Sequence, residues 1–168
     1  MNLETSDGRR FTLIVDGYEF PDEELGPTED NPADEFEVGR FLIVSHTFRI
    51  PEGEWRASGP TMTTTELQGF VDWLKSIRDG CPSKPGVYFT ERDLEFTVDD
   101  SHTILRVHVF RNFLPPWIDS ADSVTIDFPI TSVQFDRVID SLQHQLTRFP
   151  GRPPIRDATE QTEEREPE

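Results

Sequence analysis

Two segments of the chain carry the start signal of a helix followed by a single apolar stripe. Thr63-Thr64-Thr65-Glu66 and Thr131-Ser132-Val133-Gln134 have capping-box spacing, in which the first and fourth side chains accept free backbone N–H groups. A helix with one apolar stripe has to bury it against another layer, so the rest of the chain has to supply a sheet. The stripes comprise Leu67, Phe70, Val71, Leu74 and Ile77 in the first segment, and Phe135, Val138, Ile139, Leu142, Leu146 and Phe149 in the second.

Most other periodic segments predict strands. Residues 11–15 and 124–128 are rich in apolar and β-branched side chains, and residues 41–44 are apolar on both faces, which favours a central strand. Residues 94–98 and 105–109 alternate with period two on either side of a turn. The sequence therefore predicts an α+β fold: a curled, mostly antiparallel sheet of five to six strands with two helices packed on one face.

The turn between the two alternating segments sets an expected register. If Val98 pairs with Thr103, Glu95 faces Arg106 and Asp93 faces His108. The facing side chains then have compatible charges. The Asp93–His108 pair is read either as a satisfied cross-strand hydrogen bond, which we favour, or as an acid–base pair.

The length of 168 residues suits one domain. We expect a flexible N-terminus at residues 1–8, a single domain at residues 9–152 and a disordered acidic tail at residues 153–168, which has almost nothing to bury. No apolar run approaches the roughly 20 residues of a membrane span, and the N-terminus lacks the apolar segment of a signal peptide. With Cys81 as the lone cysteine, these features indicate a cytoplasmic protein.

The net charge of −17 is concentrated at the two ends of the chain. Residues 1–40 hold 12 acidic and 3 basic side chains, and residues 19–37 hold nine carboxylates without a single Lys or Arg. Such a surface repels nucleic acid and anionic membranes and attracts cationic proteins. A solvated loop kept for solubility is the alternative interpretation.

Sequence signals for chemistry are few. The chain contains no G-x-S-x-G, P-loop, G-x-G-x-x-G, H-E-x-x-H or paired C-x-x-C motif, so we expect no catalysis, metal or cofactor. One alternative stays open: an enzyme or small-ligand domain that uses the polar sheet face around Asp93, Glu95, Arg106 and His108. A pocket open to that face would favour this alternative.

Five motifs in order give the chain a resemblance to a known family. They are Trp55 ahead of the helix, TELQGFVDWL at 65–74, FTE at 89–91 with Leu94 and Phe96, PPW at 115–117, and LTRFPGR at 146–152. Together they resemble the pattern of the WapI-type immunity proteins, over roughly residues 11–152. The chain departs from that pattern at Gly69-Phe70, at Arg92-Asp93 where Pro-Asn is common, and in its acidic loop and tail.

The resemblance implies a non-enzymatic antitoxin that binds and neutralises the toxic domain of a polymorphic toxin, often a nuclease. It gives Trp117 an architectural role at an end of the core. A basic toxin domain would be attracted by carboxylates, so we expect no nucleic-acid or membrane partner and predict partner contacts at Asp22, Glu23, Glu24, Glu29, Asp30, Asp34, Glu35 and Glu37.

Overall fold

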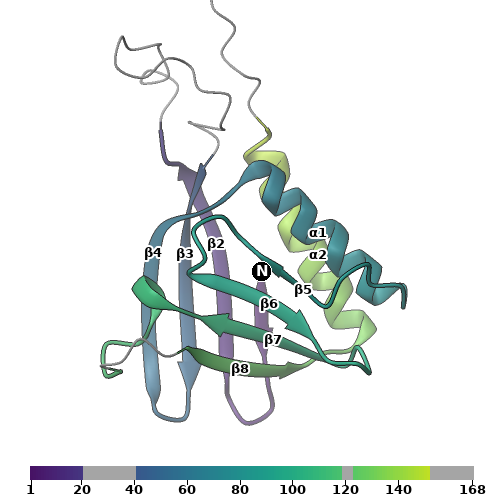
Figure 1. Cartoon of the computed structure of the whole chain (residues 1–168), viewed down its shortest axis with the longest axis horizontal. Helices are drawn as coiled ribbons and strands as arrows, with labels where there is room; N and C mark the ends of the chain where they lie inside the picture. The colour runs from purple at the N-terminus through teal and green to yellow at the C-terminus, as the bar shows by residue number, and fades with distance from the viewer. Residues whose placement is uncertain (21–40, 119–122, 152–168) are drawn as a thin grey trace, which may run out of the picture.

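The computed structural model describes residues 1–20, 41–118 and 123–151, which form two four-stranded antiparallel sheets and two long helices (Figure 1). The first sheet has the order β1 (Asn2–Glu4), β2 (Arg10–Tyr18), β3 (Phe41–Ile50) and β4 (Gly53–Thr63). The second has the order β5 (Gly86–Tyr88), β6 (Leu94–Val98), β7 (Ile104–Val109) and β8 (Val124–Pro129). The helices are α1 (Thr64–Arg78) and α2 (Ser132–Arg148), and a short 3-10 helix, η2 (Arg111–Phe113), follows β7.

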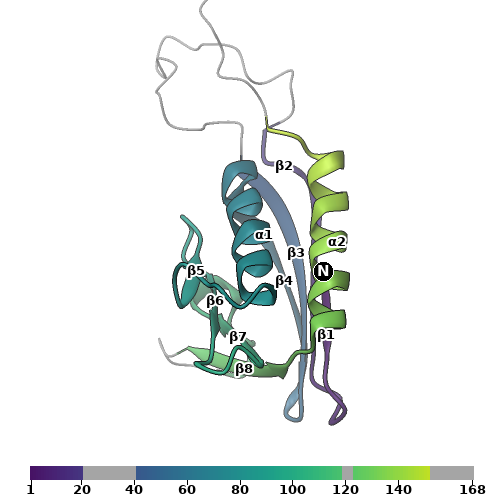
Figure 2. The same cartoon turned by 90° about the vertical axis from the view of Figure 1, so that its right-hand side faces the viewer.

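The two sheets lie face to face, and the strands of the second cross those of the first (Figures 1 and 2). Helices α1 and α2 lie side by side along one side of this pair of sheets. The α+β class is confirmed, but the prediction of one sheet with five to six strands is wrong in that detail. Period-two alternation identifies a strand and its buried face, yet it does not say which strands share a sheet.

The first sheet places β3 between β2 and β4, as its two apolar faces predicted. Strand β4 had no sequence signal because it contains Gly59 and Pro60, which weaken a strand pattern. The structure tolerates Pro60 because β4 is an edge strand and the register shifts there: Leu42 pairs with Met62, whereas Ile43 pairs with Pro60. A bulge therefore takes up the extra residue of the edge strand.

The N-terminal residues also form part of the sheet. Strand β1 pairs with β2 in antiparallel fashion, and the side chains of Met1 and Leu3 are each only 4% exposed. The expectation that residues 1–8 are flexible is therefore corrected for residues 1–4. A three-residue strand is too short to show a period, so only its burial reveals it.

Both predicted helices begin at their capping boxes. The Thr63 hydroxyl accepts from the Glu66 N–H at 3.1 Å, and the Glu66 carboxylate accepts from the Thr63 N–H at 2.8 Å. Thr131 and Gln134 make the same reciprocal pair before α2. The second carboxylate oxygen of Glu66 accepts from both the N–H and the hydroxyl of Thr90 at 2.8 Å, so one side chain joins the start of α1 to the loop before β6.

The core is held together by a contact network of aromatic rings that crosses the layers. The ring of Phe96 in β6 lies 5.8 Å from that of Phe11 in β2 and 4.4 Å from that of Phe70 in α1. Phe89 packs edge-on against Phe70. All four side chains are fully buried. Since such aromatic pairs add to the free energy of area burial, this network fixes how the sheets and α1 face one another.

A polar contact joins α2 to the first sheet. The Gln145 side-chain oxygen accepts from the Val15 N–H at 2.6 Å, and Gln145 is only 8% exposed. The Leu13 N–H donates to the Met1 carbonyl oxygen at 3.0 Å. The Val15 N–H, two residues further along β2, points to the same edge beyond the start of β1, so Gln145 supplies the acceptor that no strand provides there.

We predict that Gln145→Ala lowers the free energy of unfolding by about 2 kcal/mol, because the buried Val15 N–H loses its acceptor. Urea denaturation followed by circular dichroism measures the change. Gln143→Ala, on the exposed side of the same helix, is the matched control and should stay within about 0.5 kcal/mol of the wild type. Equal effects of the two substitutions would contradict the role assigned to Gln145.

Candidate functional site

All eight carboxylates predicted to bind the partner lie at residues 22–37, outside the described residues. The structure describes the two places where the sheet meets this segment, and they are adjacent: the Glu19 N–H donates to the Phe41 carbonyl oxygen at 2.8 Å. Burial, with the nearby charge of Glu91, raises the pKa of Glu19 above its ordinary value. Residues 20 and 41, which flank the segment, therefore lie at one end of the first sheet, near the carboxylates of Glu19 and Glu91.

The described residues are much less acidic than the whole chain. They hold 17 acidic and 12 basic side chains, a formal charge of −5, compared with −17 for the full sequence. Most of the negative charge therefore lies in residues 21–40, 119–122 and 152–168. In the described part, any recognition by charge depends on local groups of side chains rather than on a field of one sign.

The register of the β6–β7 hairpin differs from the expected one by two residues. Val98 pairs with Leu105 rather than Thr103, so Glu95 faces His108 and Thr97 faces Arg106. The Asp99 carboxylate lengthens the turn, because it accepts from the N–H groups of Thr103 and Ile104 at 2.8 and 2.7 Å. A shift of two leaves every side chain on its predicted face.

The Asp93–His108 pair is not formed. The His108 ring nitrogens lie 2.7 Å from the Thr97 hydroxyl and 3.0 Å from the Thr125 hydroxyl, and burial lowers the pKa of the ring. Asp93 is 5% exposed and accepts from the Asn112 side chain at 3.2 Å. Arg106 pairs with Asp127 at 3.2 Å. Three of the four residues of the alternative site thus have separate partners, and among the described residues Glu95 makes no hydrogen bond or ion pair.

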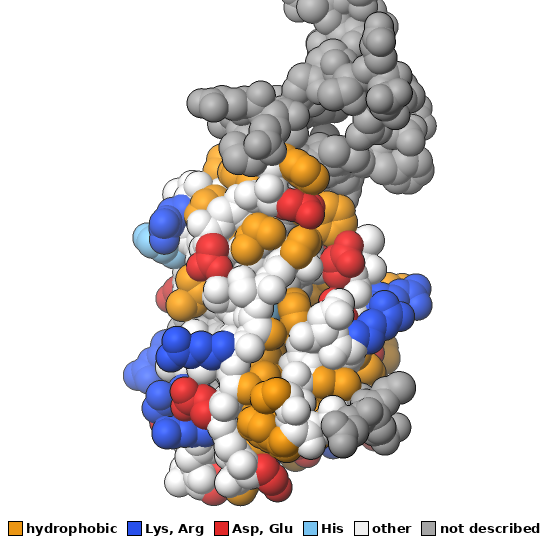
Figure 3. All heavy atoms as spheres, turned by 90° about the vertical axis from the view of Figure 1, so that its left-hand side faces the viewer, with side chains coloured by type: hydrophobic (Ala, Val, Ile, Leu, Met, Phe, Trp, Pro, Cys, Tyr) orange, Lys and Arg blue, Asp and Glu red, His pale blue; other side chains and the backbone are white. Residues whose placement is uncertain are grey.

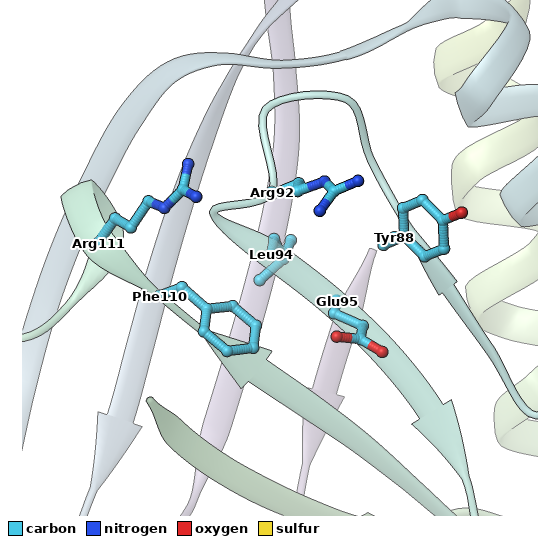
Figure 4. Close-up of a pocket in the computed structure, with 6 residues that line it drawn as sticks. All are labelled: Tyr88, Arg92, Leu94, Glu95, Phe110 and Arg111. Atoms are coloured by element: carbon cyan, nitrogen blue, oxygen red, sulfur yellow. The ribbon is translucent and has the colours of Figure 1, made fainter. Parts of the chain in front are cut away.

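A hollow of about 520 Å³ does open at one end of this polar face (Figure 4). Only Glu95 of the four predicted residues lines it. The others come from the ends of β5, β6 and β7 and the turns beside them, and sequence reasoning did not identify them as site residues. The lining is formed by Tyr88, Arg92, Leu94, Glu95, Phe110 and Arg111.

Trp117 lies on another side of the molecule. Its ring packs edge-on against Trp55 at 5.6 Å and covers Gly53, where an added Cβ would approach the ring to 2.8 Å. Trp117 is nevertheless 44% exposed. Figure 3 shows the hydrophobic side chains that gather on the side carrying β4. Trp117 therefore supports the edge of the sheet without being buried, and its truncation should cost less than the 3–5 kcal/mol typical of a core aromatic.

His46 is a titratable group inside the core. It is 1% exposed, its ring lies 4.7 Å from that of Phe113, and Nε2 is 3.3 Å from the Thr61 hydroxyl. Burial lowers the pKa of His46 to about 3. A neutral, enclosed imidazole of this kind contributes to packing, so it is unsuited to exchange protons with a substrate.

No group of three or more His, Cys, Asp and Glu within the described ranges could hold a metal ion. Neither helix that the structure describes is long and apolar enough to cross a bilayer.

Comparisons with known proteins give one match. The model of the immunity protein WapI-like family matches residues 2–150, which include all eight strands and both helices. A search of curated proteins finds no match.

We predict that His46 makes the protein less stable as pH falls from about 6.5 towards 4. The unfolded state then binds a proton that the folded state excludes, and the free energy of unfolding falls by at most about 1.4 kcal/mol per pH unit. His46→Phe should flatten this slope in urea titrations between pH 4 and 7. His108 is retained in the variant and contributes in the same direction.

His144→Gln, which removes an exposed histidine of α2, is the control and should keep the wild-type slope. The carboxylates of Asp7 and Asp99, whose pKa values are lowered to about 2 by hydrogen bonds, lose their contribution only below about pH 4. A slope that survives His46→Phe unchanged would show that His46 is not its source.

Proposed function

The chain belongs to the WapI-like immunity protein family, and from this we propose that it binds a cognate toxin domain and neutralises it as a stoichiometric inhibitor. The family implies toxin neutralisation. We propose in addition that the chain inhibits the toxin domain by occupying its surface and does not act on it as an enzyme. The family match over residues 2–150 supports the proposed function, because the match extends over both sheets and both helices rather than over one motif.

The arrangement of titratable groups supports a binding role. Among the described residues, His108, Arg106 and Asp93 each have a separate partner and His46 is enclosed. Catalytic sites bring unlike titratable groups together around an open cavity. The hollow that does exist is lined by arginine, aromatic and aliphatic side chains with one carboxylate, a composition that suits contact with a protein surface.

We further propose that the toxin domain is basic and acts in the cytoplasm, with a nuclease as the favoured class. A nuclease presents Lys and Arg to phosphates, and a carboxylate-rich inhibitor can occupy that surface by charge complementarity. The residues proposed for this contact are Asp22, Glu23, Glu24, Glu29, Asp30, Asp34, Glu35 and Glu37.

We expect the cognate toxin domain to be encoded beside the gene of this chain, and the function is tested with that domain. Expression of that domain alone should arrest growth, and co-expression of the chain should restore it. Titration calorimetry should give one inhibitor per toxin domain. Absence of a complex would contradict the proposal, and rescue by a small fraction of one equivalent would indicate turnover.

The acidic segment is tested by association kinetics. Neutralising Asp22, Glu23 and Glu24 together to Asn and Gln should slow association with the toxin domain several-fold and weaken its salt dependence, because such charges steer encounter within a screening length of roughly 8 Å. Surface plasmon resonance at two ionic strengths measures both rates.

The control neutralises three exposed carboxylates that have no hydrogen-bond or ion-pair partner among the described residues, Glu52, Asp100 and Asp140. It removes the same charge elsewhere and should have the smaller effect. Equal slowing by both triple variants would point to net charge alone and would leave the segment without a specific role.

A further inference from the structure

The hollow beside β6 contains two guanidinium groups without a carboxylate partner among the described residues. Arg92 is exposed and lies 5.7 Å from the centre of the Tyr88 ring, and Arg111 is exposed at the start of η2. Most other arginines that the structure describes have an acidic partner, as Arg78 does with Asp79 and Asp136. Unpaired arginines beside exposed aromatics have the composition of binding hot spots.

The backbone at both arginines is in a conformation that favours glycine. Arg92 has φ 51° and Arg111 has φ 44°, and among described non-glycine residues only His102 shares this feature. A residue with a side chain at such a positive φ lowers the stability of the fold relative to glycine at the same position. Two of the three strained positions therefore lie on the rim of one hollow, where stability alone would favour a residue without a side chain.

Asp93, which is buried, links the two segments that carry the arginines. Asp93, next to Arg92, accepts the Phe110 N–H on its carbonyl oxygen at 3.0 Å and the Asn112 amide on its carboxylate at 3.2 Å. These bonds tie the turn before β6 to the turn after β7, so both sides of the rim have a fixed spacing. A preorganised rim lowers the entropy lost when a partner binds.

The surface around the hollow is open. No other described element covers the outer face of the second sheet (Figure 2), and Tyr88 is 66% exposed. In Figure 4 the side chains of Arg92, Tyr88 and Phe110 surround Leu94, while Glu95 lies on the side away from Arg92 and Arg111. The hollow thus has two cations along one rim, an anion on the other and the aromatic side chains of Tyr88 and Phe110 beside them, while Leu94 is fully buried beneath it.

We propose that this hollow receives an acidic segment of the toxin domain, with carboxylates at Arg92 and Arg111 and an apolar side chain between Tyr88 and Phe110. The inference rests on the proposed function and names a contact surface for it. Arginine pairs carboxylates through charge-assisted hydrogen bonds. Glu95 repels carboxylates placed on the opposite rim, which fixes the direction of the segment.

A nucleic-acid occupant is disfavoured by the net charge of −17. The hollow and the acidic residues 22–37 carry opposite signs, so we expect a partner that presents both an acidic and a basic region. Opposite contacts of this kind determine orientation as well as attraction.

The test compares Arg92→Gly and Arg111→Gly with the wild type in binding to the toxin domain encoded beside the gene. Each variant should raise Kd about tenfold, mainly through faster dissociation. Each should also unfold at a denaturant midpoint equal to or above that of the wild type, because glycine adopts the positive φ without strain. A merely structural arginine would not combine intact stability with weaker binding.

Charge reversal provides the matched comparison. Arg92→Glu should weaken binding more than Arg92→Gly. Arg56→Glu, at an exposed arginine of β4 that has no acidic partner among the described residues, should leave Kd within about twofold. Asp or Glu substitution by Arg within the acidic segment of the toxin domain should restore binding of Arg92→Glu.

The outcomes are distinguishable. A tight wild-type complex that tolerates Arg92→Gly and Arg111→Gly overturns this inference alone, as does an equal loss from Arg56→Glu. A wild-type protein that forms no complex overturns the proposed function and this inference with it.

Discussion

The stacking of rings on Phe96 is the contact on which the rest of the structure depends. Phe96 comes from the second sheet, Phe11 from the first and Phe70 from α1, so three separately formed elements meet on one side chain. Each sheet has an apolar face and each helix an apolar stripe, but these patterns alone allow several arrangements. The rings select one of them. Because Phe96 points inward, its neighbour Glu95 points outward, and the polar face and the hollow follow from this alternation.

The elements with local signals could be predicted from the sequence. Thr63 with Glu66 and Thr131 with Gln134 form capping boxes within four residues, so no distant part of the chain has to be known. The arrangement of the strands in two sheets could not be predicted, since it depends on which faces meet. Strand β4 was hidden by Pro60, which only an edge position at a bulge accommodates. The register of β6 with β7 was missed because the Asp99 carboxylate extends the turn.

The site was less accessible to sequence reasoning than the fold. Asp93 and His108 attracted interest because titratable residues facing each other across a hairpin can act together, but threonines hold His108 and Asn112 holds Asp93. Arg92 stood out only as a departure from a family pattern, and Arg111 did not stand out at all. Positive backbone φ angles and a shared hollow distinguish these two arginines, and arginine is not a residue type that predicts a left-handed conformation. Family resemblance indicated the kind of function without indicating the surface that performs it.

The double use of Glu66 has a consequence for how the domain opens. One of its oxygens completes the cap of α1 and the other holds the loop that leads to Arg92 and β6. Helix ends and loops are ordinarily the first regions to fray, each with its own opening free energy. Here the first turn of α1 and the loop before the second sheet share one anchor, so neither opens without loosening the other. We therefore expect the helix start and the rim of the hollow to open together as one cooperative unit in native-state hydrogen exchange.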